Sequence, residues 1–256
     1  MKINVSAGHN PDGKKACGAV GVVKESVVNR EIKNRVFQLL KAQGHDVVDS
    51  TEDNGTSAGD VLTKCVRKDN AHSAEITLQF HLNSCVADYN GDGKTTGVEC
   101  LIYSEKARET ATRICEEIAK LGYHNRGVKI NQSLYFLRKT SATAILVECF
   151  FCDDLDDAKL YNVENMSQAI VRAVTGQVDT VTSVETPKVP ETKSNDFAIP
   201  SLRGYKGFSI VGGLKSFGYD SSMSYRKKVW SALGHTAKYK GSSKQNTLML
   251  NELKAR

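Results

Sequence analysis

Three short apolar stretches of this sequence each end in a residue that can bind a metal ion or transfer a proton. Residues 76–84 read ITLQFHLNS, and this apolar run closes on His81. A second run precedes His9, and a third runs into Glu148. Such runs are typical of strands buried on both faces, and α/β proteins present their chemistry at the carboxyl edge of the sheet. If the three ends converge, two imidazoles and a carboxylate share one pocket, which indicates a metal site.

The elements that must position these residues alternate along the chain. Strands are predicted at residues 2–5, 46–50, 76–84, 98–103, 134–137 and 144–147. Apolar residues at helical spacing predict one helix that opens near Glu25 and stops at Gly44, and three more at residues 60–74, 110–121 and 166–174. This alternation predicts an α/β fold, with a mostly parallel sheet of about six strands flanked by helices.

The residue types near the strand ends suit zinc. Zinc prefers imidazole nitrogen and carboxylate oxygen, and catalytic zinc sites use three protein ligands. His9, Glu25 and His81 supply two histidines and one glutamate. A glutamate at the start of a helix has a simpler explanation as well, because acidic side chains favour the positive end of a helix. Position alone therefore leaves the role of Glu25 open.

Glu148 is the candidate catalytic base. It stands in the apolar segment ILVECF, where an ionised carboxylate is expensive to bury, so it must face a site or have a raised pKa. Hydrolysis by zinc-activated water needs a group that takes a proton from the water and returns it to the leaving amine. Two candidates for substrate binding are Asn83, beside His81, and Arg67, which is either a solvated helix residue or a cation facing the substrate.

Composition bounds the class of protein. The chain has 256 residues, of which 40% are hydrophobic and 25% charged, as in an ordinary soluble globular protein. No apolar run approaches the length of a membrane span, and the sequence MKINVSAGHN at the start lacks the form of a signal peptide. We therefore expect synthesis in the cytoplasm without membrane insertion.

Seven cysteines, most of them among apolar neighbours, are expected to be reduced thiols of the core. Cys149 and Cys152 form a C-x-x-C motif. A redox role is disfavoured because that motif requires a helix N-terminus, whereas the two phenylalanines between these cysteines continue a strand end.

The amino-acid composition changes after residue 176. Residues 177–200 contain three of the four prolines and predict a linker. Residues 201–256 contain 11 Lys and Arg against 2 Asp and Glu, a net charge of +9, and predict three short helices near 209–217, 223–233 and 243–253. This basic module favours an anionic partner such as a phosphate-rich polymer.

The segment from Asp88 to Glu99 matches the calcium loop of an EF-hand at its diagnostic positions. An EF-hand requires a helix on each side of this loop, and here both flanks are predicted strands. Calcium binding is therefore disfavoured, and a polar turn between two strands is the simpler interpretation.

Several short motifs occur in order over residues 1–176. They are Gly8-His9-Asn10, Glu25, FHLNS around His81, NGDG at 90–93 before Gly97-Val98-Glu99, LYFLRKT at 134–140 and ILVECF at 145–150. Together they resemble the zinc-dependent N-acetylmuramoyl-L-alanine amidases of the type 3 class. The resemblance implies cleavage of the amide between N-acetylmuramic acid and the L-alanine of the peptidoglycan stem. It also implies that His9, Glu25 and His81 bind zinc and that Glu148 is the catalytic base.

One departure concerns the loop around the first histidine. Many members of the family have Asp-Pro before the Gly-His pair and a second Gly after it, whereas this chain has Ser6-Ala7 and Asn10. The ligand itself is present, so the difference affects the residues that surround it.

The C-terminal module resembles the short three-helix wall-binding repeats of phage lytic enzymes. The resemblance is carried by IVGGLKS at 210–216, YDSS at 219–222, RKK at 226–228 and QNT at 245–247. It implies a catalytic domain (1–176), a linker (177–200) and a cell-wall-binding domain (201–256). The whole is similar to a phage endolysin that is made in the host cytoplasm and acts on the wall after release through a holin-type pore.

Three alternatives remain. A bacterial autolysin or sporulation amidase would contain the same catalytic residues. A catalytically inert wall-binding protein is disfavoured by the intact Glu148. A nucleic-acid binder would explain the basic module, but an anionic wall polymer selects the same lysines and arginines. The expected partners are therefore bacterial peptidoglycan and an anionic wall polymer.

Overall fold

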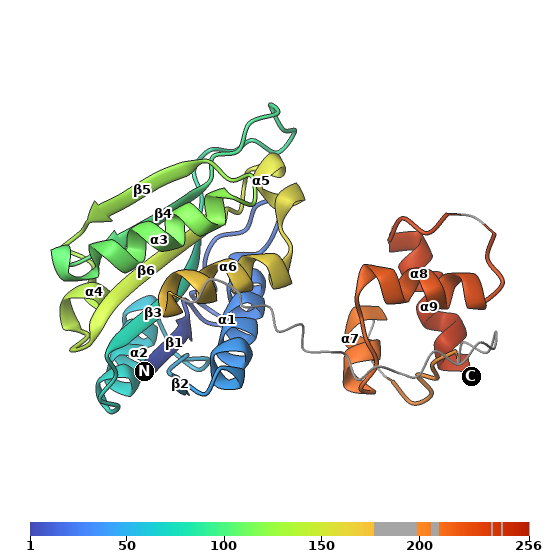
Figure 1. Cartoon of the computed structure of the whole chain (residues 1–256), viewed down its shortest axis with the longest axis horizontal. Helices are drawn as coiled ribbons and strands as arrows, with labels where there is room; N and C mark the ends of the chain where they lie inside the picture. The colour runs from blue at the N-terminus through green and yellow to red at the C-terminus, as the bar shows by residue number, and fades with distance from the viewer. Residues whose placement is uncertain (177–198, 206–209, 237, 242, 256) are drawn as a thin grey trace. The chain divides into compact units, whose positions relative to one another are not determined.

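The computed structural model describes residues 1–176, 199–205, 210–236, 238–241 and 243–255. The chain divides into two compact units, Met1–Thr182 and Ser183–Arg256 (Figure 1). The predicted linker at 177–200 falls almost entirely outside the described residues.

The first unit is built on one six-stranded sheet with the strand order β2-β1-β3-β6-β4-β5. Its strands are β1 (Lys2–Ala7), β2 (Asp46–Asp49), β3 (Ile76–Asn83), β4 (Val98–Ile102), β5 (Asn125–Ile130) and β6 (Thr143–Phe151). Neighbouring strands run parallel except β4 and β6, which are antiparallel. The predicted α/β class and mostly parallel sheet are thereby confirmed.

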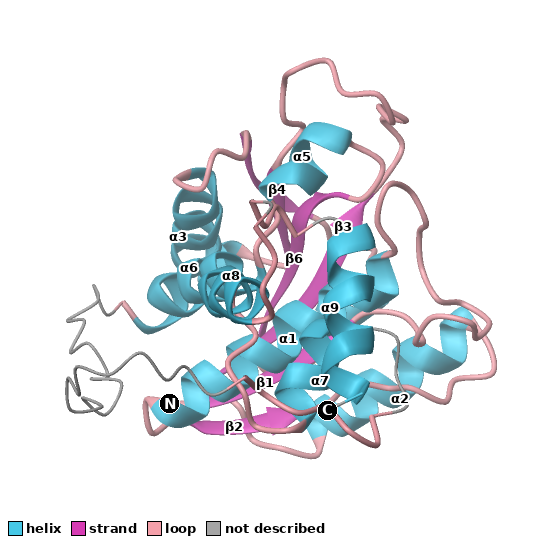
Figure 2. Ribbon diagram, turned by 90° about the vertical axis from the view of Figure 1, so that its right-hand side faces the viewer, coloured by secondary structure: helices cyan, strands magenta, loops and turns pink. Residues whose placement is uncertain are grey.

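Helices cover both faces of this sheet. On one face lie α1 (Glu25–Ala42), α3 (Arg108–Ala119) and α6 (Val163–Thr175), whose apolar stripes bury the main core against the strands. On the other face, α2 (Ala58–Asn70) and the short α4 (Tyr135–Lys139) cover a smaller cluster. Figure 2 shows α3 and α6 on the opposite side of the strands from α2. A 3-10 turn (Glu105–Ala107) precedes α3, and α5 (Leu155–Leu160) follows β6.

Two sequence-based assignments differ from the structure. Residues 134–137, predicted as a strand, form the N-cap and first three residues of α4, and β5 was not predicted. The side chain of Asn131 accepts hydrogen bonds from the backbone N–H groups of Ser133 and Leu134, which sets the turn into this helix. Phe136 and Leu137 are then buried beneath α2, so the apolar run serves a helix rather than a strand.

The second unit contains α7 (Ile210–Ser216), α8 (Met223–Ala232) and α9 (Ser243–Ala255), in agreement with the three predicted helices. Its core consists of Leu202, Ile210, Leu214, Val229, Trp230, Tyr239, Met249, Leu250 and Leu253. Lys227 and Lys228 of α8 are exposed. Among the described residues, no helix is both long and apolar enough to cross a membrane.

Candidate metal centre

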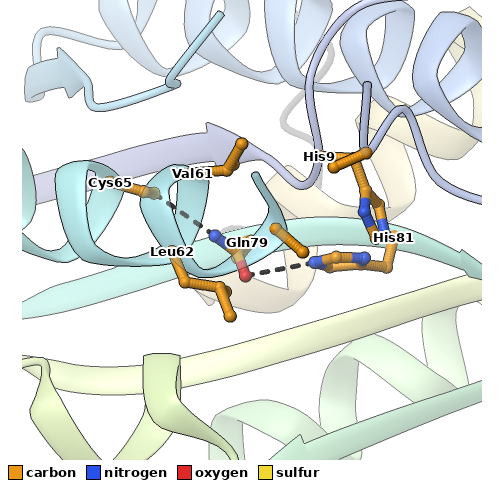
Figure 3. Close-up of a pocket in the computed structure, with 8 residues that line it drawn as sticks. His9, Val61, Leu62, Cys65, Gln79 and His81 are labelled. Carbon is orange, nitrogen blue, oxygen red and sulfur yellow. Dashed lines mark hydrogen bonds between the residues drawn. The ribbon is translucent and has the colours of Figure 1, made fainter. Parts of the chain in front are cut away.

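His9, Glu25 and His81 meet at the carboxyl edge of the sheet. Their candidate ligand atoms all lie within 4.8 Å of one another. Glu25 Oε1 is 2.9 Å from His81 Nδ1 and 3.2 Å from His9 Nε2, and the two imidazole rings stand edge to face with their centroids 4.9 Å apart. Figure 3 shows the two histidines side by side at the end of the pocket. The structure therefore brings the three predicted ligands together.

His9 follows β1 in a left-handed backbone conformation, with a φ of 62°. The guanidinium of Arg30 donates a 2.7 Å hydrogen bond to the carbonyl of His9, and Asn29 donates one to the carbonyl of Gly8. Both donors are on α1, so the helix that carries Glu25 also fixes the loop that carries His9. The side chain of Asn10 bonds the backbone of Lys15 and Gly55, which fastens the loop beyond the histidine.

Gly8 makes room for the second histidine. Its backbone N–H bonds the carbonyl of Phe80, so Gly8 lies beside His81 on the neighbouring strand. A Cβ at this position would lie 2.0 Å from His81 Cε1 and 2.2 Å from Nε2. Gly18 is also close on another side, because a Cβ there would lie 2.4 Å from Glu25 Oε2. Two glycines thus shape the cradle around the three side chains.

Glu25 turns toward the sheet and is only 3% exposed. Besides the histidines, it accepts hydrogen bonds from the backbone N–H groups of Ala19 and Leu82. Burial alone would raise the pKa of Glu25, but the hydrogen bonds from His81 and His9 outweigh it and hold that pKa well below its ordinary value. A solvated residue at a helix N-terminus would not be enclosed in this way, so the helix dipole does not account for Glu25 by itself.

His81 faces an oxygen atom at each ring nitrogen. Nδ1 faces Glu25, and Nε2 lies 3.1 Å from Gln79 Oε1 (Figure 3). Burial lowers the pKa of His81, despite the nearby Glu25, and a neutral imidazole has only one N–H. It can therefore donate to Glu25 or to Gln79 but not to both. When the hydrogen is on Nε2, toward Gln79, the Nδ1 lone pair faces the Glu25 carboxylate, and a cation bound by both would offset that repulsion.

The donor set therefore fits a divalent metal ion. An ionised glutamate and two imidazoles are the ligands zinc prefers, and here they converge within a partly buried cradle.

Glu148 lies beside this cluster. It pairs with His81 in the register of β6 and β3, so the two side chains share a face of the sheet. Its Oε2 atom is buried and has no hydrogen-bond partner among the described residues. Burial raises the pKa of Glu148 to about 8, with further contributions from the charges of Glu25 and Glu99. A carboxyl of this kind can hold and transfer a proton near neutral pH.

Glu99 of β4 pairs with Glu148 in the antiparallel register and so lies on the same face. It accepts hydrogen bonds from Arg126 at 2.8 Å and Lys129 at 2.5 Å, both on β5. Asn83 donates a 3.1 Å hydrogen bond to the other oxygen of Glu99. The candidate site is therefore one part of a polar row that crosses four strands.

The two predicted substrate-binding residues have different surroundings. Asn83 is joined to the polar row through Glu99. Arg67 is exposed on α2 and does not line the pocket beside the histidines. That pocket is lined by His9, Ala16, Ala58, Val61, Leu62, Cys65, Gln79 and His81 (Figure 3).

The loop that matches the calcium pattern has strands on both sides, as predicted. Glu99, the last residue of the pattern, points to Arg126 and Lys129. Asp153 accepts three backbone hydrogen bonds from residues 85–87, and Asp157 accepts one from Gly97, so the segment after β6 fastens both ends of the loop.

The seven cysteines are unpaired, and Cys65, Cys100, Cys115, Cys149 and Cys152 are buried. Sequence reasoning missed Gln79, Arg126 and Lys129. Gln79 could have been found, because residues two apart on a strand share a face and Gln79 precedes His81 by two.

Comparison with known proteins gives the family. The model of the N-acetylmuramoyl-L-alanine amidase family matches residues 3–179. The chain belongs to this family. That match contains all four residues of the candidate site and ends before the basic C-terminal helices.

Two solved structures illustrate the similarity. The catalytic domain of an endolysin that targets Clostridium difficile has a TM-score of 0.61 and 31% identity, covering 69% of this chain and 98% of that one. The amidase AmiC2 of Nostoc punctiforme has a TM-score of 0.58 and 23% identity, covering 69% of this chain and 96% of that one, and it shows the shared fold.

The sequence relatives match this chain over only part of their own length. An uncharacterised protein of Clostridium perfringens is 37% identical over 164 residues, covering 63% of this chain and 47% of that protein. The endolysin of Bacillus phage SPP1 is 30% identical over 166 residues, covering 61% of this chain and 56% of that protein. The chain spans about half the length of these curated relatives.

Proposed function

We propose that this amidase-family protein hydrolyses the amide bond between the lactyl group of N-acetylmuramic acid and the L-alanine of the peptidoglycan stem, with zinc as its cofactor. The observation that carries the proposal is the position of Glu148. Its unpartnered carboxyl oxygen lies on the same face as His81, which meets His9 and Glu25 in a three-donor cluster. The family match over residues 3–179 supports the same reaction.

His9, Glu25 and His81 would hold the zinc ion. Bound there, zinc would polarise the scissile carbonyl and lower the pKa of a water molecule. Gln79 fixes the orientation of His81 by accepting from its Nε2 atom, and the backbone N–H groups of Ala19 and Leu82 fix Glu25. The ligands are thus held before substrate arrives.

Glu148 would carry the proton. Its Oε2 atom would accept a proton from the attacking water as the water oxygen bonds to the lactyl carbonyl carbon. The same carboxyl would then donate that proton to the alanine nitrogen as the carbon–nitrogen bond breaks, so that the amine leaves uncharged. In the metal-free protein burial raises the pKa of Glu148, so its carboxyl holds a proton more readily than a solvated glutamate does. The apolar residues Val61 and Leu62 of α2 line the pocket beside the histidines and would exclude water from one side of the scissile bond.

Metal analysis of the purified chain tests this function. We expect about one zinc ion per chain, loss of peptidoglycan hydrolysis after chelation, and recovery when zinc is restored. Full activity in a metal-free preparation would overturn the proposal.

We also propose that the protein is a phage endolysin whose residues 201–256 bind the cell wall, with residues 177–200 as the linker. The similarity to two endolysins supports this role, and a bacterial autolysin or sporulation amidase is the alternative. The net charge of +9 and the exposed Lys227 and Lys228 suit an anionic wall polymer. Tethering of this kind would raise the concentration of the enzyme at its substrate.

Charge reversal tests the wall-binding role. Lys227→Glu with Lys228→Glu should weaken sedimentation with purified cell walls, most strongly at low salt, while turnover of a soluble muramoyl peptide stays unchanged. The matched control reverses Lys106 and Lys120 in the first unit. Equal wall binding by both double variants would contradict the proposal.

A further inference from the structure

An ion-pair cluster beside Glu148 has no part in the hydrolysis proposed above. Glu99, one strand from Glu148, accepts hydrogen bonds at a single oxygen from both Arg126 and Lys129. One carboxylate balances only one of these two cations. The cluster therefore keeps one net positive charge on the face that carries the candidate site, and that charge is available to an anion.

Arg126 is oriented for such an anion. Its Nε atom donates to Glu99 at 2.8 Å, and its guanidinium carbon lies 4.9 Å from the centroid of the Phe151 ring. Within the described part of the chain, the two terminal NH2 groups have no hydrogen-bond partner, and the side chain is 32% exposed. Glu99 thus holds the Nε side of the guanidinium and Phe151 covers one of its faces. The two NH2 groups on the remaining edge can donate two parallel hydrogen bonds to a carboxylate.

The position of the fork suits a peptide that runs across the sheet from Glu148. Neighbouring strands are about 4.8 Å apart, and Arg126 lies one hydrogen bond beyond Glu99, which places its fork roughly 8–10 Å from Glu148. Two residues of extended peptide span about 7 Å, and a hydrogen bond adds about 3 Å. The second residue of the stem, counted from the scissile amide, falls within reach.

We propose that Arg126, assisted by Lys129, binds the free α-carboxylate of the stem residue that follows L-alanine. This inference rests on the proposed amidase function and adds a substrate preference to it. In the peptidoglycan stem that residue is a γ-linked D-glutamate, whose α-carboxyl is either free or amidated. Glu99 and Asn83 are positioning residues, because Asn83 holds one oxygen of Glu99 while the other holds Arg126.

Two muramoyl peptides of equal length test the proposal, one with the free α-carboxylate and one with the α-amide. With the full-length zinc-loaded chain, we expect kcat/KM to be about 10- to 100-fold higher on the free acid, mainly through KM. Arg126→Gln should remove most of this preference, because it should raise KM for the free acid far more than KM for the amide. Arg126→Lys keeps the charge without the fork and should give an intermediate preference.

The matched control is Arg35→Gln. Arg35 of α1 is 34% exposed and pairs with Glu164 of α6 on the opposite face of the sheet, so its replacement should leave the preference intact. A wild-type protein that cleaves both substrates equally would overturn the inference. An Arg126→Gln variant that keeps the preference, or that loses kcat equally on both substrates, would overturn it as well. If Arg126→Gln fails to fold, the Arg126→Lys result decides. A wild-type protein that cleaves neither substrate would instead overturn the amidase function.

Discussion

Glu148 stands opposite His81 in the parallel register of β6 and β3, on the same face of the sheet and one strand apart. The residues that flank each of them along the strand are buried in the main core, which fixes the direction of both side chains. A proton-transfer group is thereby held next to a candidate metal ligand by the sheet itself rather than by a loop.

Replacement of the carboxyl is the most direct test of the role of Glu148. Glu148→Gln should lower kcat by about 10²–10⁴-fold, because the amide cannot accept and return the proton. Zinc content should stay at the wild-type level, since Glu148 is not among the three clustered donors. Glu116→Gln, at an exposed position of α3, is the matched control. Wild-type turnover by Glu148→Gln would show that another group is the base.

The close approach of Gly8 to His81 predicts a steric effect on metal binding. In Gly8→Ala the new Cβ would lie 2.0–2.6 Å from three atoms of the imidazole, so the ring must move. We expect at least a tenfold loss of zinc affinity, measured by competition with a chelating dye. Gly59→Ala is the control, because a Cβ at Gly59 meets nothing within 4 Å. Unchanged affinity in Gly8→Ala would contradict the assignment of His81 as a ligand.

Gln79 should act on zinc through the orientation of His81. Gln79→Leu removes the acceptor at Nε2 and should weaken zinc binding by about 10- to 100-fold. Gln79→Glu retains an acceptor and should restore most of the affinity. Gln38→Leu, at an exposed position of α1, controls for the loss of an amide. If Gln79→Leu and Gln79→Glu bind zinc equally well, the hydrogen bond does not orient the ligand.

The raised pKa of Glu148 predicts a pH dependence of stability in metal-free protein. Between the ordinary value of 4.5 and the native value of about 8, the native state holds a proton that the unfolded state has lost. The free energy of unfolding contributed by this group therefore falls as pH rises through that window. Glu148→Gln lacks this contribution. The free energy of unfolding of the variant minus that of wild type, measured with urea, should therefore increase by about 1–3 kcal/mol from pH 5 to pH 8.

Asp69 and Asp157 also contribute to the pH dependence of stability, but to the same extent in both proteins. Burial raises the pKa of each to about 6, and both are present in wild type and variant, so their effects cancel. A difference between the two proteins that stays constant with pH would contradict the assignment.

The sequence reveals the buried strands and the residues at their ends for a physical reason. β1, β3 and β6 lie in the interior of the sheet, so their apolar composition is visible without a structure. β5 is an edge strand with mostly exposed residues, NRGVKI, and lacks that signal. The run LYFL at 134–137 is apolar because α4 is buried, and a run this short does not distinguish a helix from a strand.

The candidate site likewise contains residues that the sequence predicts and contacts that only the structure reveals. His9, His81 and Glu148 could be predicted because reactive side chains at the ends of apolar strands are uncommon, whereas acidic residues at a helix start are common and Glu25 needed the family resemblance. The pairing of Gln79 with His81 and of Arg126 with Glu99 depends on side-chain direction and strand register, which the sequence does not state. The exposed position of Arg67 likewise became evident only once α2 was placed.

The most direct measurement is the identity of the products released from purified peptidoglycan by the zinc-loaded chain. Mass spectrometry should find stem peptides with a free amino group on L-alanine, together with glycan strands whose N-acetylmuramic acid carries a free lactyl carboxylate. Chelation or Glu148→Gln should abolish both products. Intact lactyl–alanine amides, or cleavage only within the glycan or between stem residues, would contradict the proposed reaction.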